Sequence, residues 1–236
     1  MNEKVGFYTQ FLSNRGTVNA LFDYAYYCKH LLEYNPIIVA WSGNKGSRDA
    51  LPKFQKEFEV VFHDEPSSDD MDRVVEEHGL SWLYIIKPGF WDHVVTYKAR
   101  SLIHVVFPYN EPHGSIYAYV SRWLSEFVTK GEAPFVPHMI DILRFDHSEN
   151  LREKLEVPDT ALVFGYYGGT DTFDIEYVKC AVMDVAKTHK DIYFLFMGIL
   201  PFVSESKNII FLNGTHDERE KIRFINTTAS DTPTPT

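Results

Sequence analysis

Short β-rich segments alternate with helical segments along this 236-residue chain, and this alternation is the strongest constraint on its fold. The predicted strands are short and apolar, and they cover residues 5–8, 37–40, 60–62, 82–86, 101–106, 117–120, 161–166, 192–197 and 209–212. The predicted helices cover residues 17–33, 49–56, 69–78, 121–128, 149–155, 175–189 and 216–227. Strands that alternate with helices typically form a parallel sheet covered by helices on its faces. The sequence therefore predicts an α/β fold.

The strand and helix series is interrupted once, by the proline-containing segment PFVPHMIDI at residues 134–142. Because the alternation of predicted strands and helices begins again after this segment, we expect two domains. The closing segment TASDTPTPT carries no apolar side chain beyond Ala229 and cannot contribute to a core. The expected organisation is a Rossmann-like domain over residues 1–135, a linker over 136–147, a partial second Rossmann-like domain over 148–227 and a disordered tail over 228–236.

The composition excludes several classes of protein. A net charge of −10, from 33 acidic and 23 basic residues, argues against nucleic acid or an anionic membrane as the main partner. No apolar run approaches the roughly 18 residues of a membrane-spanning helix, and no signal sequence opens the chain, so we expect a cytoplasmic protein. Cys28 and Cys180 are too few for a disulfide framework, and we expect both to be buried and reduced.

The turn FLSNRGT, which follows the first predicted strand, is a candidate ligand site. In open α/β sheets, ligands bind outside the carboxyl ends of the strands. Ser13 and Asn14 offer hydrogen bonds, Arg15 can pair with an anion, and Gly16 permits close approach of the backbone. The alternative is an ordinary turn, with Thr17 capping the helix and a solvated arginine.

Polar residues also follow two later predicted strands. Lys87 follows strand 82–86, and Glu111, His113 and Gly114 follow strand 101–106. A carboxylate and an imidazole two residues apart can orient hydroxyl groups or exchange protons. Each residue alone has a simpler interpretation: Lys87 as a surface lysine, and His104, within an apolar strand, as a hydrogen-bonded core histidine.

A glycine-rich turn opens the second domain. Gly168 and Gly169 lie between strand 161–166 and a helix that Thr172 or Asp174 is expected to cap. Backbone N–H groups at a helix N-terminus favour phosphate. The alternative is a glycine turn that serves backbone geometry only.

Three of these segments together resemble a known family. The segments LSNRGTVNALFDYA, EPHGSIYAYVSRWLS and LREKLEVPDTALVFGYYGG are similar to group 1 glycosyltransferases of the GT-B architecture, which has two Rossmann-like domains. The branch that they resemble most acts in viral and bacterial polysaccharide assembly.

The resemblance implies a hexosyltransferase-like enzyme that moves a sugar from a nucleotide-diphosphate sugar to a saccharide or another hydroxyl acceptor. It also implies a retaining reaction without a metal or a further cofactor, with the donor on the second domain and the acceptor on the first. The sequence Asp70-Met71-Asp72 is a literal D-x-D, but its place in the acidic first turn of a helix favours a capping role. The resemblance implies that residues 13–16 face the donor sugar and diphosphate and that Lys87, His104, Glu111 and His113 line the acceptor side. The candidate catalytic residues are therefore His104, Glu111 and His113, and the candidate binding residues are Ser13, Asn14, Arg15, Gly16, Lys87, Gly114, Gly168 and Gly169.

The chain also departs from the family pattern. Tyr166 stands where the family carries an arginine, the following segment GGTDTFD lacks the family's lysine, and the later glutamate pair is missing. We therefore expect a truncated, weakly active enzyme, whose uncovered sheet edge can pair with another chain. The alternative function is a non-catalytic saccharide- or nucleotide-binding protein. A flavodoxin-like or dinucleotide-binding domain is disfavoured because no G-x-G-x-x-G is present.

Overall fold

The computed structural model describes residues 2–13, 16–43, 48–139, 149–170, 172–204, 206–215 and 217–228. The chain divides into two compact units, Met1–Ile142 and Leu143–Thr236. Each unit is described by itself.

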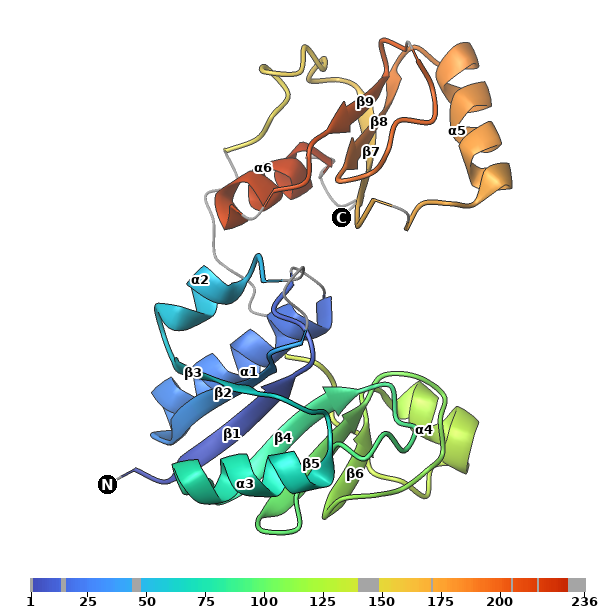
Figure 1. Ribbon diagram of the computed structural model, residues 1–236. Coiled ribbons are helices and arrows are strands. Elements are labelled where there is room, and N and C mark those ends of the chain that lie inside the picture. Colours follow the sequence, from blue (N-terminus) through green and yellow to red (C-terminus); the bar gives the residue numbers. More distant parts are fainter. Residues whose placement is uncertain are drawn as a thin grey trace, which may run out of the picture. The chain divides into compact units, whose positions relative to one another are not determined.

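The first unit contains a six-stranded sheet in which all strands are parallel (Figure 1). Its order is β3-β2-β1-β4-β5-β6, the order of a doubly wound sheet. The strands are β1 (Lys4–Thr9), β2 (Asn35–Trp41), β3 (Glu59–His63), β4 (Trp82–Lys87), β5 (Arg100–Val105) and β6 (Ile116–Tyr119). The predicted α/β class is confirmed.

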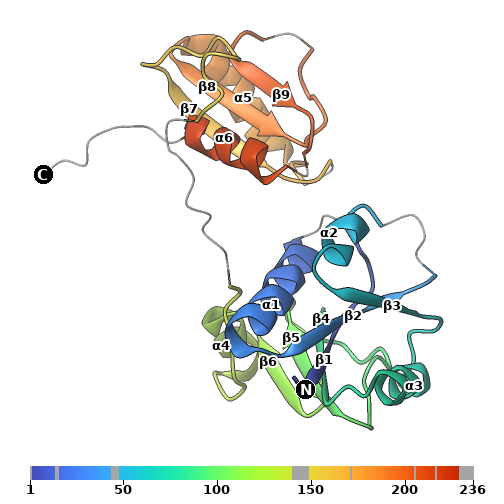
Figure 2. The same ribbon diagram turned by 90° about the vertical axis from the view of Figure 1, so that its left-hand side faces the viewer.

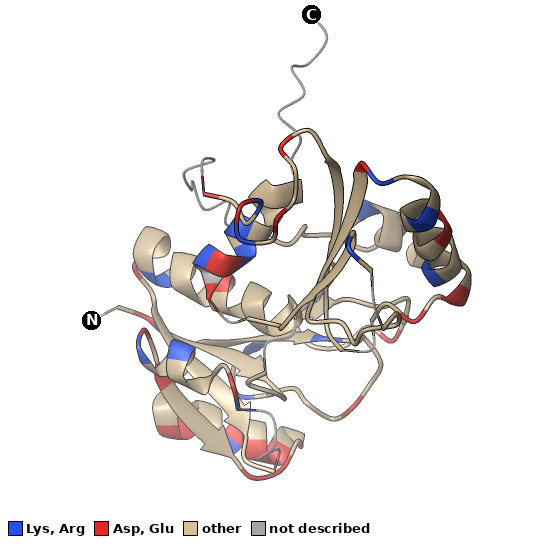
Figure 3. Cartoon of the chain, turned by 90° about the horizontal axis from the view of Figure 1, so that it is seen from above, with Lys and Arg blue, Asp and Glu red and all other residues tan. Residues whose placement is uncertain are grey.

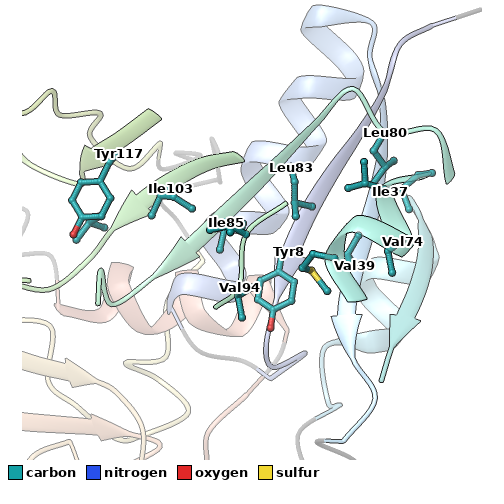
Figure 4. Packing of buried hydrophobic residues seen from close by; sticks show 14 of the residues in the cluster. Tyr8, Ile37, Val39, Val74, Leu80, Leu83, Ile85, Val94, Ile103 and Tyr117 are labelled. Carbon is teal, nitrogen blue, oxygen red and sulfur yellow. The ribbon is translucent and has the colours of Figure 1, made fainter. Parts of the chain in front are cut away.

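Helices cover both faces of this sheet (Figure 2). Helices α1 (Gly16–Leu32) and α2 (Leu51–Gln55) pack on one face through side chains such as Leu21 and Phe54. Helix α3 (Ser68–His78) packs on the other face through Met71 and Val74, and α4 (Arg122–Thr129) adds Leu124 beside β6. Figure 4 shows the apolar side chains of this second face pointing into a common layer. Charged residues lie mainly on helices and loops, and the strands are largely tan in Figure 3.

Two connections in the first unit contain no helix. The 88–99 loop joins the carboxyl end of β4 to the amino end of β5, and the 106–115 loop joins the carboxyl end of β5 to the amino end of β6. Both loops run along the face of the sheet that α3 also covers. Near the carboxyl end, the hydroxyl of Tyr117 donates to Gly89 O at 2.7 Å. Near the amino end, Thr96 N donates to Ser101 Oγ at 2.9 Å. These loops therefore occupy the place that crossover helices take elsewhere in such sheets.

The second unit contains a three-stranded parallel sheet in the order β7-β8-β9. Its strands are β7 (Leu162–Tyr167), β8 (Ile192–Met197) and β9 (Ile209–Leu212), and its helices are α5 (Glu176–Thr188) and α6 (Glu218–Thr228). Val182 of α5 and Phe224 of α6 belong to different apolar clusters on the two faces of the sheet. Pairing of this sheet with another chain stays a prediction.

Some local expectations are wrong. Thr17 lies inside α1, which begins at Gly16, so it does not cap that helix. The predicted helix at 149–155 is only a short run of turns, with Leu155 N donating to Leu151 O at 2.9 Å, and Glu156 ends it with a left-handed φ of 55°. Helix α5 has Ile175 as its N-cap residue and no side-chain cap. Cys28 is buried as expected, whereas Cys180 is exposed.

We predict that Leu83→Ala lowers the free energy of unfolding by roughly 2–5 kcal/mol, because it leaves a cavity in a close-packed layer. Leu83 is fully buried in the centre of the sheet, whereas Leu31 of α1 is 71% exposed. Leu31→Ala is therefore the matched control and should leave stability almost unchanged. Urea denaturation monitored by circular dichroism compares the two variants. Equal losses of stability would contradict the packing described above.

Candidate functional site

Strands β2 and β3 are added on one side of β1, and β4, β5 and β6 are added on its other side, so the strand order reverses between the neighbours β1 and β4. Strand β1 has β2 on one side and β4 on the other. The connections that follow β1 and β4 therefore leave a crevice between their carboxyl ends, where ligands of such sheets bind. We call this place the switch-point edge; it is formed by Thr9–Ser13 and by Lys87 with the loop that follows.

The turn after β1 begins at the switch-point edge. Thr9 Oγ1 donates to Phe11 O at 2.6 Å, and Ala50 N donates to Leu12 O at 2.7 Å, which ties the turn to α2. The hydroxyl of Ser13 is buried and has no hydrogen-bond partner among the described residues. A Cβ added to Gly16 would meet no atom within 4 Å. Asn14 and Arg15 lie outside the described residues, so their ligand contacts stay predictions.

Lys87, at the end of β4, is a buried cation. Its side chain is 5% exposed, and its Nζ donates to Asp92 Oδ1 and, at 3.2 Å, to Val94 O. Burial holds the pKa of Lys87 below its usual range, and the carboxylate of Asp92 opposes that shift. Lys87 therefore fixes the 88–99 loop to the end of β4. Its predicted contact with a substrate stays a prediction.

Glu111 and His113 lie beside that loop. Trp91 N donates to Glu111 Oε2 at 2.8 Å, and His113 Nδ1 donates to Glu111 O at 2.6 Å. Burial lowers the pKa of His113, and Lys87 lowers it further. The imidazole is therefore neutral at pH 7, and its Nε2 carries a lone pair. Nε2 is buried and has no partner among the described residues, so it is an unsatisfied hydrogen-bond acceptor, and a catalytic role for Glu111 and His113 stays a prediction.

Gly114 does not lie at a carboxyl strand end, and that expectation is wrong. Ser115 N donates to Ser101 O at 2.8 Å, and Ser101 is the second residue of β5. Because β5 and β6 are parallel, the loop between them has to return to the amino end before β6 begins. Gly114 has a φ of 74°, and a Cβ there would lie 2.9 Å from Ser101 O. Backbone packing alone therefore requires this glycine.

His104 lies on the opposite face of the sheet and is enclosed by protein groups. Its Nε2 is 2.7 Å from Val136 O, and its Nδ1 is 2.5 Å from the hydroxyl of Tyr84. Because a carbonyl only accepts, Nε2 carries the proton and Nδ1 accepts from Tyr84. Tyr24 adds a hydrogen bond to Pro137 O at 3.0 Å. This geometry gives His104 a positioning role for the segment that leaves β6 and α4, and a direct catalytic role stays a prediction.

The carboxylates of the D-x-D sequence anchor backbone. Asp70 Oδ2 accepts from Asp64 N and Glu65 N, both at 2.9 Å. Asp72 Oδ1 accepts from Tyr97 N at 2.7 Å and from Thr96 Oγ1 at 2.5 Å. In the part of the chain that the structure describes, no group of three or more His, Cys, Asp or Glu side chains is arranged to hold a metal ion.

The glycine turn after β7 forms the carboxyl edge of the second sheet. Gly168 N donates to Met197 O at 3.1 Å, and Thr172 Oγ1 donates to Gly169 O at 2.8 Å. A Cβ at Gly168 would lie 2.3 Å from Thr172 Oγ1, whereas at Gly169 it would make only an ordinary contact at 3.5 Å. Gly168 is therefore required by the turn itself. Gly169 has room for a ligand or for a methyl group.

A positive charge reaches this edge from a distant part of the sequence. Lys221 of α6 places its Nζ 5.8 Å from the ring centroid of Tyr167, at the end of β7. Tyr166, which occupies the family's arginine position, packs against Phe173 and donates to Thr172 O at 3.2 Å. The sequence alone does not place Lys221 near the glycine turn, because α6 and β7 are far apart in the chain and only the fold brings them together.

The comparisons with known proteins concern the fold. The chain matches no family model and no curated protein sequence. Its structure is similar to that of Anabaena Alr3699/HepE in complex with UDP and glucose, with a TM-score of 0.63 and 12% identity over 94% of this chain and 72% of that one. Arabidopsis thaliana UGT89C1 in complex with quercetin has a TM-score of 0.48 at 11% identity, covering 91% of this chain and 70% of that one. The likeness to HepE supports the predicted GT-B-like fold, and the viral and bacterial branch stays a prediction.

No helix in the described ranges is both long enough and apolar enough to cross a membrane.

We predict that acidification destabilises the first unit through His104. Burial lowers the pKa of His104 to about 4, whereas an unfolded histidine has a pKa near 6.5. Between these values the unfolded chain binds a proton that the folded chain does not, so the free energy of unfolding falls as the pH falls. The total loss is about 2–3 kcal/mol, with a slope of up to about 1.4 kcal/mol per pH unit. Urea denaturation at several pH values between 7 and 4 measures it.

His104→Gln should remove this contribution to the slope, whereas His189→Gln, at an exposed histidine of α5's C-cap, should keep it. A slope that is unchanged in His104→Gln would show that His104 is not buried in its neutral form.

We predict that Asp92→Asn destabilises the first unit, because it leaves the buried cation of Lys87 without a negative partner. Removing one member of a buried ion pair costs roughly 3–5 kcal/mol. Asp92 is 28% exposed, so we expect the lower end of that range. The double variant Lys87→Met with Asp92→Leu replaces the whole pair and should recover most of the loss in thermal and urea unfolding. Wild-type stability of Asp92→Asn would refute the role given to the pair.

Proposed function

We propose that this chain is a nucleotide-sugar-dependent glycosyltransferase. It transfers a sugar from a nucleotide-diphosphate sugar to a hydroxyl group of a saccharide or similar acceptor. The observation that carries this proposal is the likeness in fold, over 94% of the chain, to a protein crystallised with UDP and glucose. The family resemblance of the sequence supports the same reaction.

The second unit binds the donor in this proposal. Its carboxyl edge presents the backbone of Gly169 in the turn that precedes α5, and Lys221 lies beside Tyr167 at the end of β7. Backbone N–H groups and a cation suit a diphosphate. The first unit holds the acceptor in this proposal, with the unpaired hydroxyl of Ser13 at the switch-point edge and the loops that Lys87 and His113 help to fix beside it.

The transfer needs no metal in this proposal and retains the anomeric configuration. Cationic groups and oriented N–H groups can stabilise the charge that develops on a departing diphosphate. Tyr166 is engaged with Phe173 where the family carries an arginine, so turnover is slow. The same observation favours the alternative, a protein that binds nucleotide sugars without catalysis. Action in polysaccharide assembly in the cytoplasm is part of the proposal.

Calorimetric titration of the chain with UDP and UDP-glucose in EDTA tests donor binding. We expect Lys221→Met to weaken UDP binding about tenfold, the equivalent of about 1.4 kcal/mol. Lys187→Met is the matched control, because Lys187 lies in the last turn of α5, at the other end of that helix from the glycine turn. Gly169→Ala should also weaken binding without a loss of thermal stability. Arg15→Ala tests the sequence-based prediction for the turn in the first unit.

Failure of UDP and UDP-glucose, and also of GDP- and ADP-sugars, to bind would contradict the proposal. Donor binding with neither hydrolysis nor transfer to any acceptor would favour the non-catalytic alternative. Release of UDP from UDP-glucose in EDTA, detected by chromatography, would support the enzyme.

A further inference from the structure

The two helix-free loops of the first unit enclose a pocket of about 360 Å³. Its wall is formed by the side chains of Trp91, Thr96, Tyr97, His113 and Ser115, by Gly114 and by two small apolar residues. We call it the loop pocket. Because Gly114 and Ser115 pack against Ser101, the pocket lies toward the amino end of β5. The six residues of β5 rise about 3.3 Å each, so the amino end of this strand lies roughly 16 Å from its carboxyl end.

The wall of the loop pocket is built in advance. Asp72 of α3 accepts hydrogen bonds from Thr96 Oγ1, Tyr97 N and Lys98 N. Ser101 Oγ donates to Thr96 O at 3.0 Å. These bonds fix the loop that carries Tyr97, so a ligand would not have to order it. Preorganisation of this kind reduces the entropic cost of binding.

The chemistry of the loop pocket selects an uncharged ligand. Among its described lining residues there is no Lys, Arg, Asp or Glu, although 24% of the chain is charged. A phosphate or a nucleotide would find no cation here. The wall instead presents two aromatic rings, with Trp91 37% and Tyr97 71% exposed, next to hydroxyl groups.

A saccharide matches this combination of groups. Each sugar ring has an apolar face of C–H groups, which packs on aromatic rings, and a rim of hydroxyls, which hydrogen-bonds. His113 adds an acceptor: its Nδ1 proton is given to Glu111 O, and its buried Nε2 has no partner among the described residues. An unpaired buried acceptor is costly. The rings of Trp91 and His113 are in edge-to-face contact, with 5.1 Å between their centroids, so a ligand hydroxyl reaches Nε2 only if the Trp91 side chain shifts.

We propose that the loop pocket is a saccharide-binding subsite that holds a part of the acceptor away from the reacting hydroxyl. The assignment to an acceptor rests on the proposed function, whereas the capacity to bind an uncharged saccharide rests on the pocket alone. A subsite at this distance favours acceptors of several sugar units over single sugars.

The experiment titrates the full chain, without nucleotide, with cellotriose, maltotriose and chitotriose, and follows tryptophan fluorescence and saturation-transfer NMR. We expect at least one trisaccharide to bind, and to bind more tightly than its monosaccharide. Trp91→Ala and Tyr97→Ala should each weaken this binding at least tenfold. Trp123→Ala is the matched control, since Trp123 is a 66% exposed tryptophan on α4 and outside the pocket, and it should bind as the wild type does.

Binding to none of the trisaccharides, or equal binding by the wild type and Tyr97→Ala, would overturn the proposal. Tyr97 is largely exposed, so this variant keeps the test valid even if Trp91→Ala unfolds. UDP titrations of the same variants separate the two proposals. Trisaccharide binding that depends on Tyr97 in a chain that binds no nucleotide sugar would support the pocket and reject the glycosyltransferase.

Discussion

Burial of the central strands on both faces is the constraint on which the first unit depends. Val5, Ile37, Ile38 and Val39 are fully buried, and they alternate between the two apolar layers of the sheet. Parallel strands buried in this way can be joined only by connections that cross a face of the sheet. Every loop that follows a strand therefore starts at one edge, and this edge collects the polar groups that the core excludes.

The half of the sheet formed by β4, β5 and β6 meets this constraint without helices. The connections that cross the face there are loops, whose backbone groups need hydrogen-bond partners other than those of a helix. Asp72, Ser101 and Tyr117 supply such partners from outside the loops, and Asp92 supplies one to Val94 within the 88–99 loop. The buried charge of Lys87 is stabilised by the same arrangement. The two loops are thereby fixed against the sheet, and substrate binding by this part of the first unit stays a proposal.

The sequence was sufficient for the strands because each one is a short, apolar run between turn-forming residues. Strands β8 and β9 have the predicted bounds, and the others differ by one or two residues at their ends. Helix ends were less predictable: α3 has a side-chain cap at Ser67, but α5 is capped by Ile175 without a side-chain bond. Propensity does not encode these ends, because tertiary contacts set them.

The candidate site was predictable in its residue types and only partly in their placement. The two hydrogen bonds of His104 agree with the alternative that it is a core histidine, and its predicted catalytic role stays a prediction. Gly114 was predicted at the carboxyl end of β5 but lies near its amino end. The pattern of strands and helices does not show where a loop without a helix crosses the sheet. Lys221 and Tyr97 could not be placed beside the proposed sites from the sequence, because their contacts join segments far apart in the chain.

Hydrogen–deuterium exchange of the chain with and without UDP-glucose tests the central claim most directly. If the carboxyl edge of the second sheet binds the donor, protection should appear in the segments that follow β7 and β8, at residues 167–173 and 198–204. The lysines at the C-terminal end of α5 should exchange as they do in the free protein. Protection confined to the end of α5, or no protection in the second unit at saturating UDP-glucose, would contradict the account.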